Sequence, residues 1–352
     1  MIKSVLVIRN DKIGDFVNTW PALYQLKQAL PHASIEVFVD PVLQEFAKAC
    51  PYVDHVIVDN GDDKAITKAF AARHYDAAIA SRSQIRTYRL LRKLNIPYKL
   101  APKLNWYQYL YRHRASIAVP KGLGGWRKSC MMVEHFLADH KIPIPKLPTR
   151  YWDLSRERRK WQDYYGQQGE ERLIFAHPGT GGSANSISPE NFAALLTQVD
   201  RLTNISCKFV LTYSGSEVEQ AKEIYAQLSA KGVKVAMARP LTNLADFAKS
   251  LVAADMFMAG STGPLHIAGL HDVPTVGFYA GRRSAPKVRW QTLTQSDKRL
   301  AFTPPIGRKT GRNMSLIDLD LAAKEIACFL TAQYLKQANV GQASGEEKKC
   351  LS

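Results

Sequence analysis

The sequence predicts an α/β protein with two domains, each built on a doubly wound parallel sheet. Strand-length apolar runs alternate with segments of helical period, which is the order expected when helices cover both faces of a parallel sheet. The alternation occurs twice, over residues 5–94 and again over residues 173–279. The chain has 352 residues, which is long for one hydrophobic core and suits two domains of common size.

The first series starts with a β-branched run at residues 5–8, followed by a loop and a helix that ends at Pro31. Beyond it we expect strands at 35–39, 55–59 and 76–80, and helices at 42–50, 63–74 and 84–94. Periodicity is weak over residues 97–154, where one helix is expected near 131–139. The strongly polar segment 156–171 follows, and we place the domain boundary there.

The second series has the same alternation. Strands are expected at 173–176, 208–212, 233–236, 256–259 and 275–279, and helices at 189–202, 217–231, 244–252 and from 265 onwards. A last helix is expected at about 316–335, before a tail whose polar, Gly/Ser/Lys-rich composition predicts disorder. The predicted divisions are therefore residues 1–160, residues 172–318, a helix at 319–336 and a disordered tail at 337–352.

Composition excludes several classes of protein. The content of 46% hydrophobic and 22% charged residues is that of an ordinary globular protein, and no apolar run of about 18 residues predicts a membrane span. The N-terminus lacks the apolar region of a signal peptide, so we expect a cytoplasmic protein. Five dispersed cysteines indicate reduced thiols and offer no zinc-binding spacing, so no metal site is predicted.

A basic segment suggests an anionic partner. The net charge is +17, and residues 81–129 contain no Asp or Glu. Four cations recur at helical spacing and should share one face, where they could bind an anionic ligand or simply be solvated: Arg82, Arg86, Arg89 and Lys93. Aromatic residues interleave with these charges, which would also suit nucleic acid or a membrane interface: Trp106, Tyr107, Tyr109, Tyr111 and Trp126.

The turn S-T-G-P precedes a predicted helix, where free N–H groups and the helix dipole favour a phosphate. Ser261 is expected to be the N-cap, and Thr262 follows it. Gly263 lets a ligand approach the backbone, Pro264 suits the first turn, and His266 could add a donor. The alternative is an ordinary capped turn with a core histidine.

A glycine-rich loop, H-P-G-T-G-G-S, follows the first strand of the second series. Such a loop can present several N–H groups to phosphate oxygens, although it could equally be a flexible surface connection. The candidate phosphate ligands are Thr180, Gly181, Gly182 and Ser183.

An acidic residue, Asp15, lies where the first strand turns into a helix, a position at which open α/β sheets place functional groups. It could instead be a first-turn acid stabilised by the helix dipole. The same loop has a single glycine, Gly14, and not the G-x-G-x-x-G of a dinucleotide-binding turn, so NAD binding is not expected.

Three stretches resemble the bacterial lipopolysaccharide heptosyltransferase family, glycosyltransferase family 9, and together they span most of residues 5–281. They read VLVIRNDKIGDFVNTWPAL, HPGTGGSANSISPENF and LTNLADFAKSLVAADMFMAGSTGPLHIAGLHDVPTVGFYAG. The resemblance implies the GT-B architecture, in which two Rossmann-like domains face each other across a cleft. In that architecture the last helix, here residues 319–336, can cross back onto the first domain.

The resemblance also implies a reaction: inverting transfer of heptose from ADP-heptose to the lipopolysaccharide inner core, on a lipid-linked acceptor at the cytoplasmic face of the inner membrane. By this resemblance Asp15 is the general base, and Gly14 and the P-A-L at 21–23 match the family motif around it. The donor nucleotide would be held by the glycine-rich loop and the S-T-G-P-x-H turn. No cofactor is implied, and no Asp-x-Asp metal motif is found.

Two positions depart from the family pattern. Members commonly place Lys or Arg before the proline of the glycine-rich loop, where this chain has N-S-I-S at 185–188, and Arg282 and Arg283 are the nearest substitutes. The residue before T-G is often Asp but is Ser261 here. A different donor sugar or an inactive nucleotide-sugar-binding protein therefore stays an alternative, as does a nucleic-acid-binding protein on a Rossmann-like scaffold.

Overall fold

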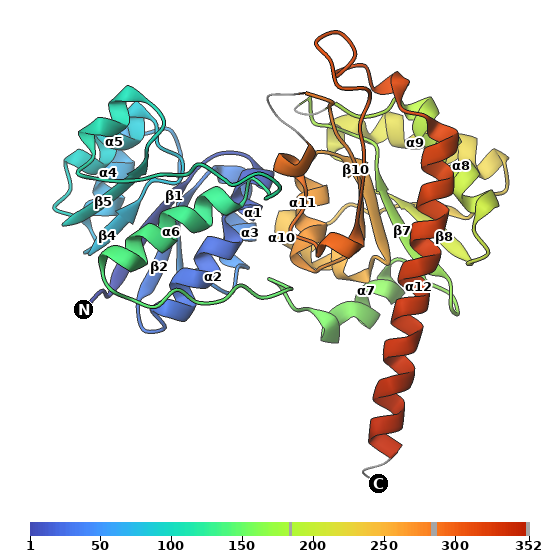
Figure 1. The fold of residues 1–352 in the computed structure, drawn as a ribbon, viewed down its shortest axis with the longest axis horizontal. Coiled ribbons are helices and arrows are strands. Elements are labelled where there is room, and N and C mark those ends of the chain that lie inside the picture. The colour runs from blue at the N-terminus through green and yellow to red at the C-terminus, as the bar shows by residue number, and fades with distance from the viewer. Residues whose placement is uncertain (183–184, 283–286, 350–352) are drawn as a thin grey trace. The chain divides into compact units, whose positions relative to one another are not determined.

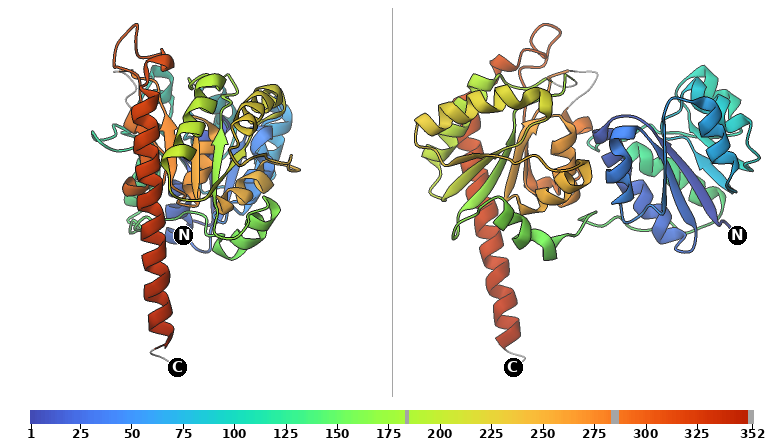
Figure 2. Two further views of the ribbon diagram at one scale, coloured as in Figure 1. Left: turned by 90° about the vertical axis from the view of Figure 1, so that its right-hand side faces the viewer. Right: turned by 180° about the vertical axis from the view of Figure 1, so that it is seen from behind.

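The computed structural model describes residues 1–182, 185–282 and 287–349, with side chains to residue 336. The chain forms two compact units, Met1–Asp153 with Leu241–Ser250, and Leu154–Pro240 with Leu251–Ser352. Each unit contains one six-stranded sheet in which all strand pairs are parallel (Figures 1 and 2), so the predicted pair of doubly wound α/β domains is confirmed. The chain passes from the first unit to the second at residue 154, just before the polar segment used to place the boundary.

The first sheet has the order β3-β2-β1-β4-β5-β6. Its strands are β1 (Ser4–Arg9), β2 (Ser34–Val39), β3 (His55–Val58), β4 (Ala77–Ile79), β5 (Tyr98–Pro102) and β6 (His113–Ala115). The chain adds β2 and β3 on one side of β1 and then β4 on the other, so the strand order reverses beside β1. In open α/β sheets this reversal marks the usual ligand site, outside the carboxyl ends of the strands.

Helices cover both faces of this sheet, which is why residues 5–8 of β1 form an unbroken, buried apolar run. The helices of the unit are α1 (Ile13–Val17), α2 (Trp20–Ala29), α3 (Gln44–Lys48), α4 (Asp63–Ala71), α5 (Ile85–Arg92), α6 (Arg127–Asp139) and α10 (Leu244–Ser250), with 3-10 turns Pro41–Leu43 and Trp106–Leu110. The single helix predicted after β1 is divided into α1 and α2. The helix expected near 131–139 begins earlier, at Arg127.

The second sheet has the order β12-β11-β10-β7-β8-β9 and reverses beside β7. Its strands are β7 (Arg172–His177), β8 (Cys207–Leu211), β9 (Val235–Met237), β10 (Met256–Gly260), β11 (Thr275–Phe278) and β12 (Arg299–Phe302). The helices are α7 (Arg158–Tyr164), α8 (Pro189–Leu202), α9 (Val218–Ala230), α11 (Gly263–Leu270) and α12 (Leu319–Lys349), with 3-10 turns Ser155–Glu157, Gly215–Glu217, Leu251–Ala253, Lys287–Trp290, Ser296–Lys298 and Met314–Leu316.

The C-terminal helix α12 belongs to the second unit, where Ala323, Ile326 and Leu330 are buried in the core shared with α8. The segment predicted to be disordered continues the helix to Lys349 (Figure 1), because its Gln, Ala, Glu and Lys residues are good helix formers despite two glycines. Residues 350–352 lie outside the described part.

Candidate functional site

Asp15 lies in α1, just beyond the carboxyl end of β1, as the sequence predicts. Arg9, the last residue of β1, donates from Nη2 to Asp15 Oδ1 at 2.8 Å and from Nε to the Asp15 carbonyl at 3.1 Å. The Asp15 side chain is nevertheless 39% exposed. The carboxylate is therefore held in a fixed place while it remains accessible to a ligand from solvent.

A second carboxylate, Asp11, shares the same arginine. Arg9 Nε lies 3.1 Å from Asp11 Oδ1, and the Asp11 side chain is only 19% exposed. Burial raises the pKa of Asp11 to about 6; the charge of Asp15 acts in the same direction, and Arg9 and Arg82 oppose it. A carboxyl group with such a pKa can exchange a proton near neutral pH, and perturbed pairs of this kind concentrate at functional sites.

Arg82 joins this cluster from the neighbouring strand. It follows β4, its guanidinium donates to the Asn10 carbonyl, and its backbone N–H donates to the Ile8 carbonyl at 3.0 Å. Arg9 Nη1 also bonds the Ser81 carbonyl at 3.2 Å. The loops after β1 and β4 are thus tied together at the point where the strand order reverses. Because α5 begins only at Ile85, Arg82 does not belong to the predicted helical stripe.

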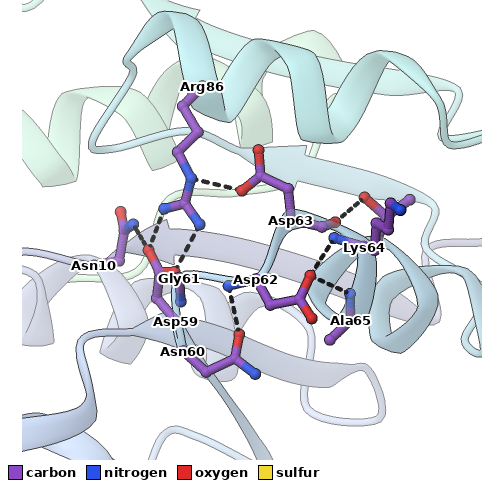
Figure 3. A network of polar contacts seen from close by, with 10 residues as sticks. Asn10, Asp59, Asn60, Gly61, Asp62, Asp63, Lys64, Ala65 and Arg86 are labelled. Atoms are coloured by element: carbon purple, nitrogen blue, oxygen red, sulfur yellow. Dashed lines mark hydrogen bonds and ion pairs between the residues drawn. The ribbon is translucent and has the colours of Figure 1, made fainter.

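Arg86, the second member of that stripe, is neutralised by two carboxylates (Figure 3). Its Nη1 and Nη2 atoms lie 2.6 and 2.9 Å from the Asp59 carboxylate, and Nε lies 2.7 Å from Asp63 Oδ1. These hydrogen bonds hold the pKa of Arg86 above its ordinary value. Burial alone would raise the pKa of Asp59, but the bonds from Arg86 and Asn10 outweigh it and lower that pKa. The free anion-binding charge predicted at Arg86 is therefore already compensated.

The other two members of the stripe, Arg89 and Lys93, are exposed, and Lys93 is the C-cap residue of α5. The four predicted anion ligands are consequently separated into a residue at the sheet edge, a paired residue and two solvated ones. Helical spacing alone could not distinguish them, because the partners of Arg86 come from β3 and α4.

In the second unit, the register of β7 with β10 pairs His177 with Ala259. The glycine-rich loop and the S-T-G-P turn therefore leave adjacent strands at the same edge of the sheet, as their proposed common role requires. The N-cap of α11 is Thr262 and not Ser261, and Pro264 occupies the first turn. Ser261 is half-buried and His266 is buried.

The hydroxyl of Thr262 is a notable buried group. The residue is 5% exposed, its side chain makes no cap hydrogen bond, and Oγ1 has no hydrogen-bond partner within the described residues. Buried hydroxyl groups are normally hydrogen-bonded to protein or water. An acceptor supplied by a ligand at the helix N-terminus would satisfy it.

The glycine-rich loop is organised by Glu217, which sequence reasoning missed. Glu217 Oε1 accepts from Gly181 N at 2.9 Å, and Oε2 accepts from Ser214 N at 2.9 Å and Ser214 Oγ at 2.7 Å. Burial would raise the pKa of Glu217, but these donors lower it. The S-x-x-E capping-box spacing at 214–217 was the available signal.

This pairing constrains the predicted phosphate ligands. Gly181 N is engaged by Glu217, and Gly182 N donates to Thr180 Oγ1 at 3.3 Å. A Cβ on Gly179 would lie 2.1 Å from the Glu217 carboxyl carbon, so a side chain there would require the Glu217 carboxylate to move. Ser183 lies outside the described residues. In this structure the loop therefore offers fewer free N–H groups than its composition suggests.

A second loop missed by sequence reasoning, residues 303–313, reaches the same edge after β12. Gly281 N donates to the Gly311 carbonyl at 2.8 Å, and Asn185 Nδ2 donates to the Arg312 carbonyl at 3.1 Å. The loop contains no acid and carries three exposed cations, Arg308, Lys309 and Arg312. Arg282, after β11, is half-buried, and its Nε has no hydrogen-bond partner in the described part of the chain. Arg283 lies outside that part.

Within residues 1–182, 185–282 and 287–336, no group of three or more His, Cys, Asp or Glu side chains is placed to hold a metal ion. Among the described residues, no helix combines the length and the apolar character needed to cross a membrane.

Comparison with known proteins places the chain in a family. The profile of glycosyltransferase family 9 (heptosyltransferase) matches residues 64–306, which is more than half of the chain. The chain belongs to this family. It is 35% identical to a Haemophilus influenzae protein named "Putative glycosyltransferase", over 96% of this chain and 100% of that protein. It is 21% identical to lipooligosaccharide heptosyltransferase 2 of Campylobacter jejuni, over 79% of this chain and 82% of that one.

Solved structures agree on the fold. Escherichia coli ADP-heptose lipopolysaccharide heptosyltransferase II superposes with a TM-score of 0.73 at 18% identity, covering 95% of this chain and 99% of that one. E. coli heptosyltransferase WaaC with ADP gives a TM-score of 0.70 at 18% identity, covering 93% and 99%. The family 9 chain described here therefore has the GT-B class of fold, and the family membership makes it a glycosyltransferase.

Proposed function

We propose that the protein transfers heptose, with inversion, from ADP-L-glycero-D-manno-heptose to the inner core of lipopolysaccharide or lipooligosaccharide. The observation that carries the proposal is Asp15, a partly exposed carboxylate fixed by Arg9 at the carboxyl edge of the first sheet. The family membership and the ADP-heptose and lipooligosaccharide enzymes among its relatives support the choice of donor and acceptor.

The chemistry proposed for Asp15 follows from the weakness of an alcohol as a nucleophile. As the acceptor oxygen forms its bond to the anomeric carbon, Asp15 takes the hydroxyl proton. The bond from the anomeric carbon to the phosphate oxygen breaks on the opposite face, and ADP leaves with the electron pair. Arg9 orients the carboxylate, and Arg82, whose charge acts on Asp11, is the member of the basic set that would bind an anionic group on the acceptor.

The donor end of the proposal uses the second unit. The N-terminus of α11 and the Thr262 hydroxyl would bind phosphate oxygens, with Ser261, Gly263, Pro264 and His266 shaping that turn. Thr180, Gly181, Gly182 and Ser183 would line the nucleotide. For their N–H groups to bind phosphate, Gly181 would have to be released by Glu217 and Gly182 by the Thr180 hydroxyl.

The charge of the leaving diphosphate needs cations, and the residues at 185–188 supply none. Arg282 and the loop that carries Arg308, Lys309 and Arg312 are our candidates for this role, because hydrogen bonds from the Gly281 backbone N–H and the Asn185 side-chain amide fix that loop at the same sheet edge. Preorganised positive charge stabilises a departing anion most where water is excluded.

The test is a donor screen with mass-spectrometric detection, using lipooligosaccharide from a strain that lacks this protein. Addition of one heptose mass from ADP-heptose, in the presence of EDTA, is the expected result. Transfer of another sugar in the same screen would refute heptose specificity and favour a different donor, consistent with Ser261 in place of the family aspartate. ADP binding without transfer of any sugar would indicate an inactive nucleotide-sugar-binding protein.

A further inference from the structure

The segment that joins β5 to β6 exposes several large apolar side chains on the surface of the first unit. Trp106 and Tyr109 are 71% and 73% exposed, and Leu104 and Leu110 are exposed beside them in sequence. Single exposed apolar residues are ordinary, but a contiguous group of large ones marks an interaction site on a globular protein.

The segment is held in this conformation by its inward-facing residues. Gln108 is buried, and its Oε1 accepts from the N–H groups of Leu104 and Asn105 at 2.7 and 2.8 Å. Tyr107 Oη donates to the Ser83 carbonyl at 3.1 Å, and Tyr111 is buried in the core. Because polar and aromatic anchors fix the backbone, the exposed side chains cannot turn inward together.

Basic residues flank the apolar cluster. Lys103 and Arg112 are exposed, and the Arg114 guanidinium lies 4.4 Å from the centre of the Tyr109 ring. No ion pair involves these three cations within the described residues, and no acid occurs between residues 81 and 129. Trp and Tyr beside Lys and Arg form the composition that partitions into the headgroup region of an anionic bilayer.

The aliphatic members of the cluster favour lipid over nucleic acid. Stacking of bases would use Trp106 and Tyr109, but Leu104 and Leu110 have no ring for a base to stack on. In a bilayer all four would transfer apolar surface out of water, so one partner accounts for the whole cluster.

We propose that residues 103–114 form a lipid-docking element. Leu104, Trp106, Tyr109 and Leu110 enter the headgroup region of an anionic bilayer, and Lys103, Arg112 and Arg114 contact lipid phosphates. This inference deepens the proposed function, because a lipid-linked acceptor lies in such a surface. Its own evidence is the exposed cluster, and the vesicle-binding test does not depend on the donor sugar.

The experiment is vesicle co-sedimentation of the full chain with phosphatidylglycerol/phosphatidylethanolamine vesicles and with phosphatidylcholine vesicles. The chain should bind the anionic vesicles. The Trp106→Ser/Tyr109→Ser variant should bind them at least about tenfold more weakly, and the Lys103→Gln/Arg112→Gln/Arg114→Gln variant should lose the preference for anionic lipid. A matched control, Tyr225→Ser on α9, removes another exposed aromatic and should bind like the wild type.

Two further measurements keep the outcomes distinct. Brominated lipids should quench more fluorescence in the wild type than in a Trp106→Phe variant, which reports insertion at this residue. Heptose transfer to a delipidated, water-soluble core acceptor should be unchanged in the Trp106→Ser/Tyr109→Ser variant, so failed docking is distinguishable from failed catalysis. Equal vesicle binding by wild type and both multiple variants would overturn the proposal, as would retention of RNA or DNA at moderate salt that these variants abolish.

Discussion

Arg9 and Asp15 form a 2.8 Å ion pair across the turn that joins β1 to α1, and the same guanidinium reaches Asp11. One arginine therefore positions two carboxylates with different exposure. We therefore expect Asp15 and Asp11 to have different roles, the first in catalysis and the second in the pH dependence of stability.

Replacing Asp15 with Asn should abolish most transfer while leaving donor binding intact. The substitution keeps the size and one hydrogen-bond acceptor but removes the basic oxygen, and loss of a general base typically lowers kcat by about 10²–10⁴-fold. The free energy of unfolding should fall by no more than about 1 kcal/mol, because the ion pair is partly exposed. Single-turnover kinetics measure the rate and calorimetry the ADP affinity. Retention of more than roughly a tenth of the wild-type rate would transfer the role to Asp11.

Asp11 should make stability depend on pH in a direction opposite to that of an ordinary salt-bridged acid. Its pKa in the folded chain, about 6, is above the usual 3.8, so the native state binds the extra proton between these values. Stability is therefore lost as pH rises from about 4 to 6. An Asp11→Asn variant should lack this loss, so its stability relative to the wild type should rise by up to about 3 kcal/mol between pH 4 and pH 7.5. Urea unfolding at pH 4 and 7.5 measures the difference, and an equal gap at both values would contradict the prediction.

Arg86 should be a structural residue, in contrast to its neighbour on the same helix. An Arg86→Gln change leaves Asp59 without its bidentate partner and should cost about 1–3 kcal/mol of unfolding free energy. The matched change Arg89→Gln, at an exposed position, should stay within about 0.5 kcal/mol of wild type. Equal losses of unfolding free energy in the two variants would show that the ion pair between Arg86 and Asp59 does not stabilise the fold.

Thr262 should affect binding without affecting stability. A Thr262→Val change preserves shape and removes a buried hydroxyl that has no partner in the described chain, so the free energy of unfolding should change by less than about 0.5 kcal/mol. ADP affinity should fall about tenfold, since a hydrogen bond to a charged phosphate is lost. Titration calorimetry and thermal unfolding on the same samples measure both effects. A destabilised variant with normal ADP affinity would make Thr262 an ordinary cap.

The cations at the carboxyl edge of the second sheet should recognise the diphosphate and not the nucleoside. A combined Arg282→Gln/Arg312→Gln variant should bind ADP about tenfold or more weakly, with a reduced dependence on salt, and should leave adenosine binding unchanged. Arg201→Gln, at an exposed position on α8, is the control. Equal weakening for ADP and adenosine would point to a disturbed loop and not to lost charge.

The central strands were predictable because their own residues form the apolar pattern that is typical of a buried strand. β1, β7 and β10 are buried on both faces, so each appears as an unbroken apolar run. β5, β6 and β12 were missed because they include charged or proline residues, such as Lys99, Pro102 and Arg299, whose place in a strand depends on neighbours in the sheet. The cap at α11 was misplaced by one residue, since Ser and Thr are both good N-cap residues.

The candidate site was predictable where one short segment builds it and not where distant segments meet. Asp15 and the S-T-G-P turn lie at the strand ends where the sequence places them. The compensation of Arg86 by Asp59, and the position of the loop that carries Arg312 against Gly281, both depend on contacts between segments far apart in the chain. No local pattern contains that information.

The contact between Gly281 and Gly311 determines which positions at the carboxyl edge of the second sheet tolerate substitution. A Cβ on Gly311 would lie 2.1 Å from the Gly281 carbonyl oxygen, so the two backbones must meet directly. Arg308, Lys309 and Arg312 are exposed and take no part in that contact. A mutant library for altered donor choice can therefore randomise positions 308, 309 and 312 on an intact scaffold, whereas a single alanine at 311 would displace all three together.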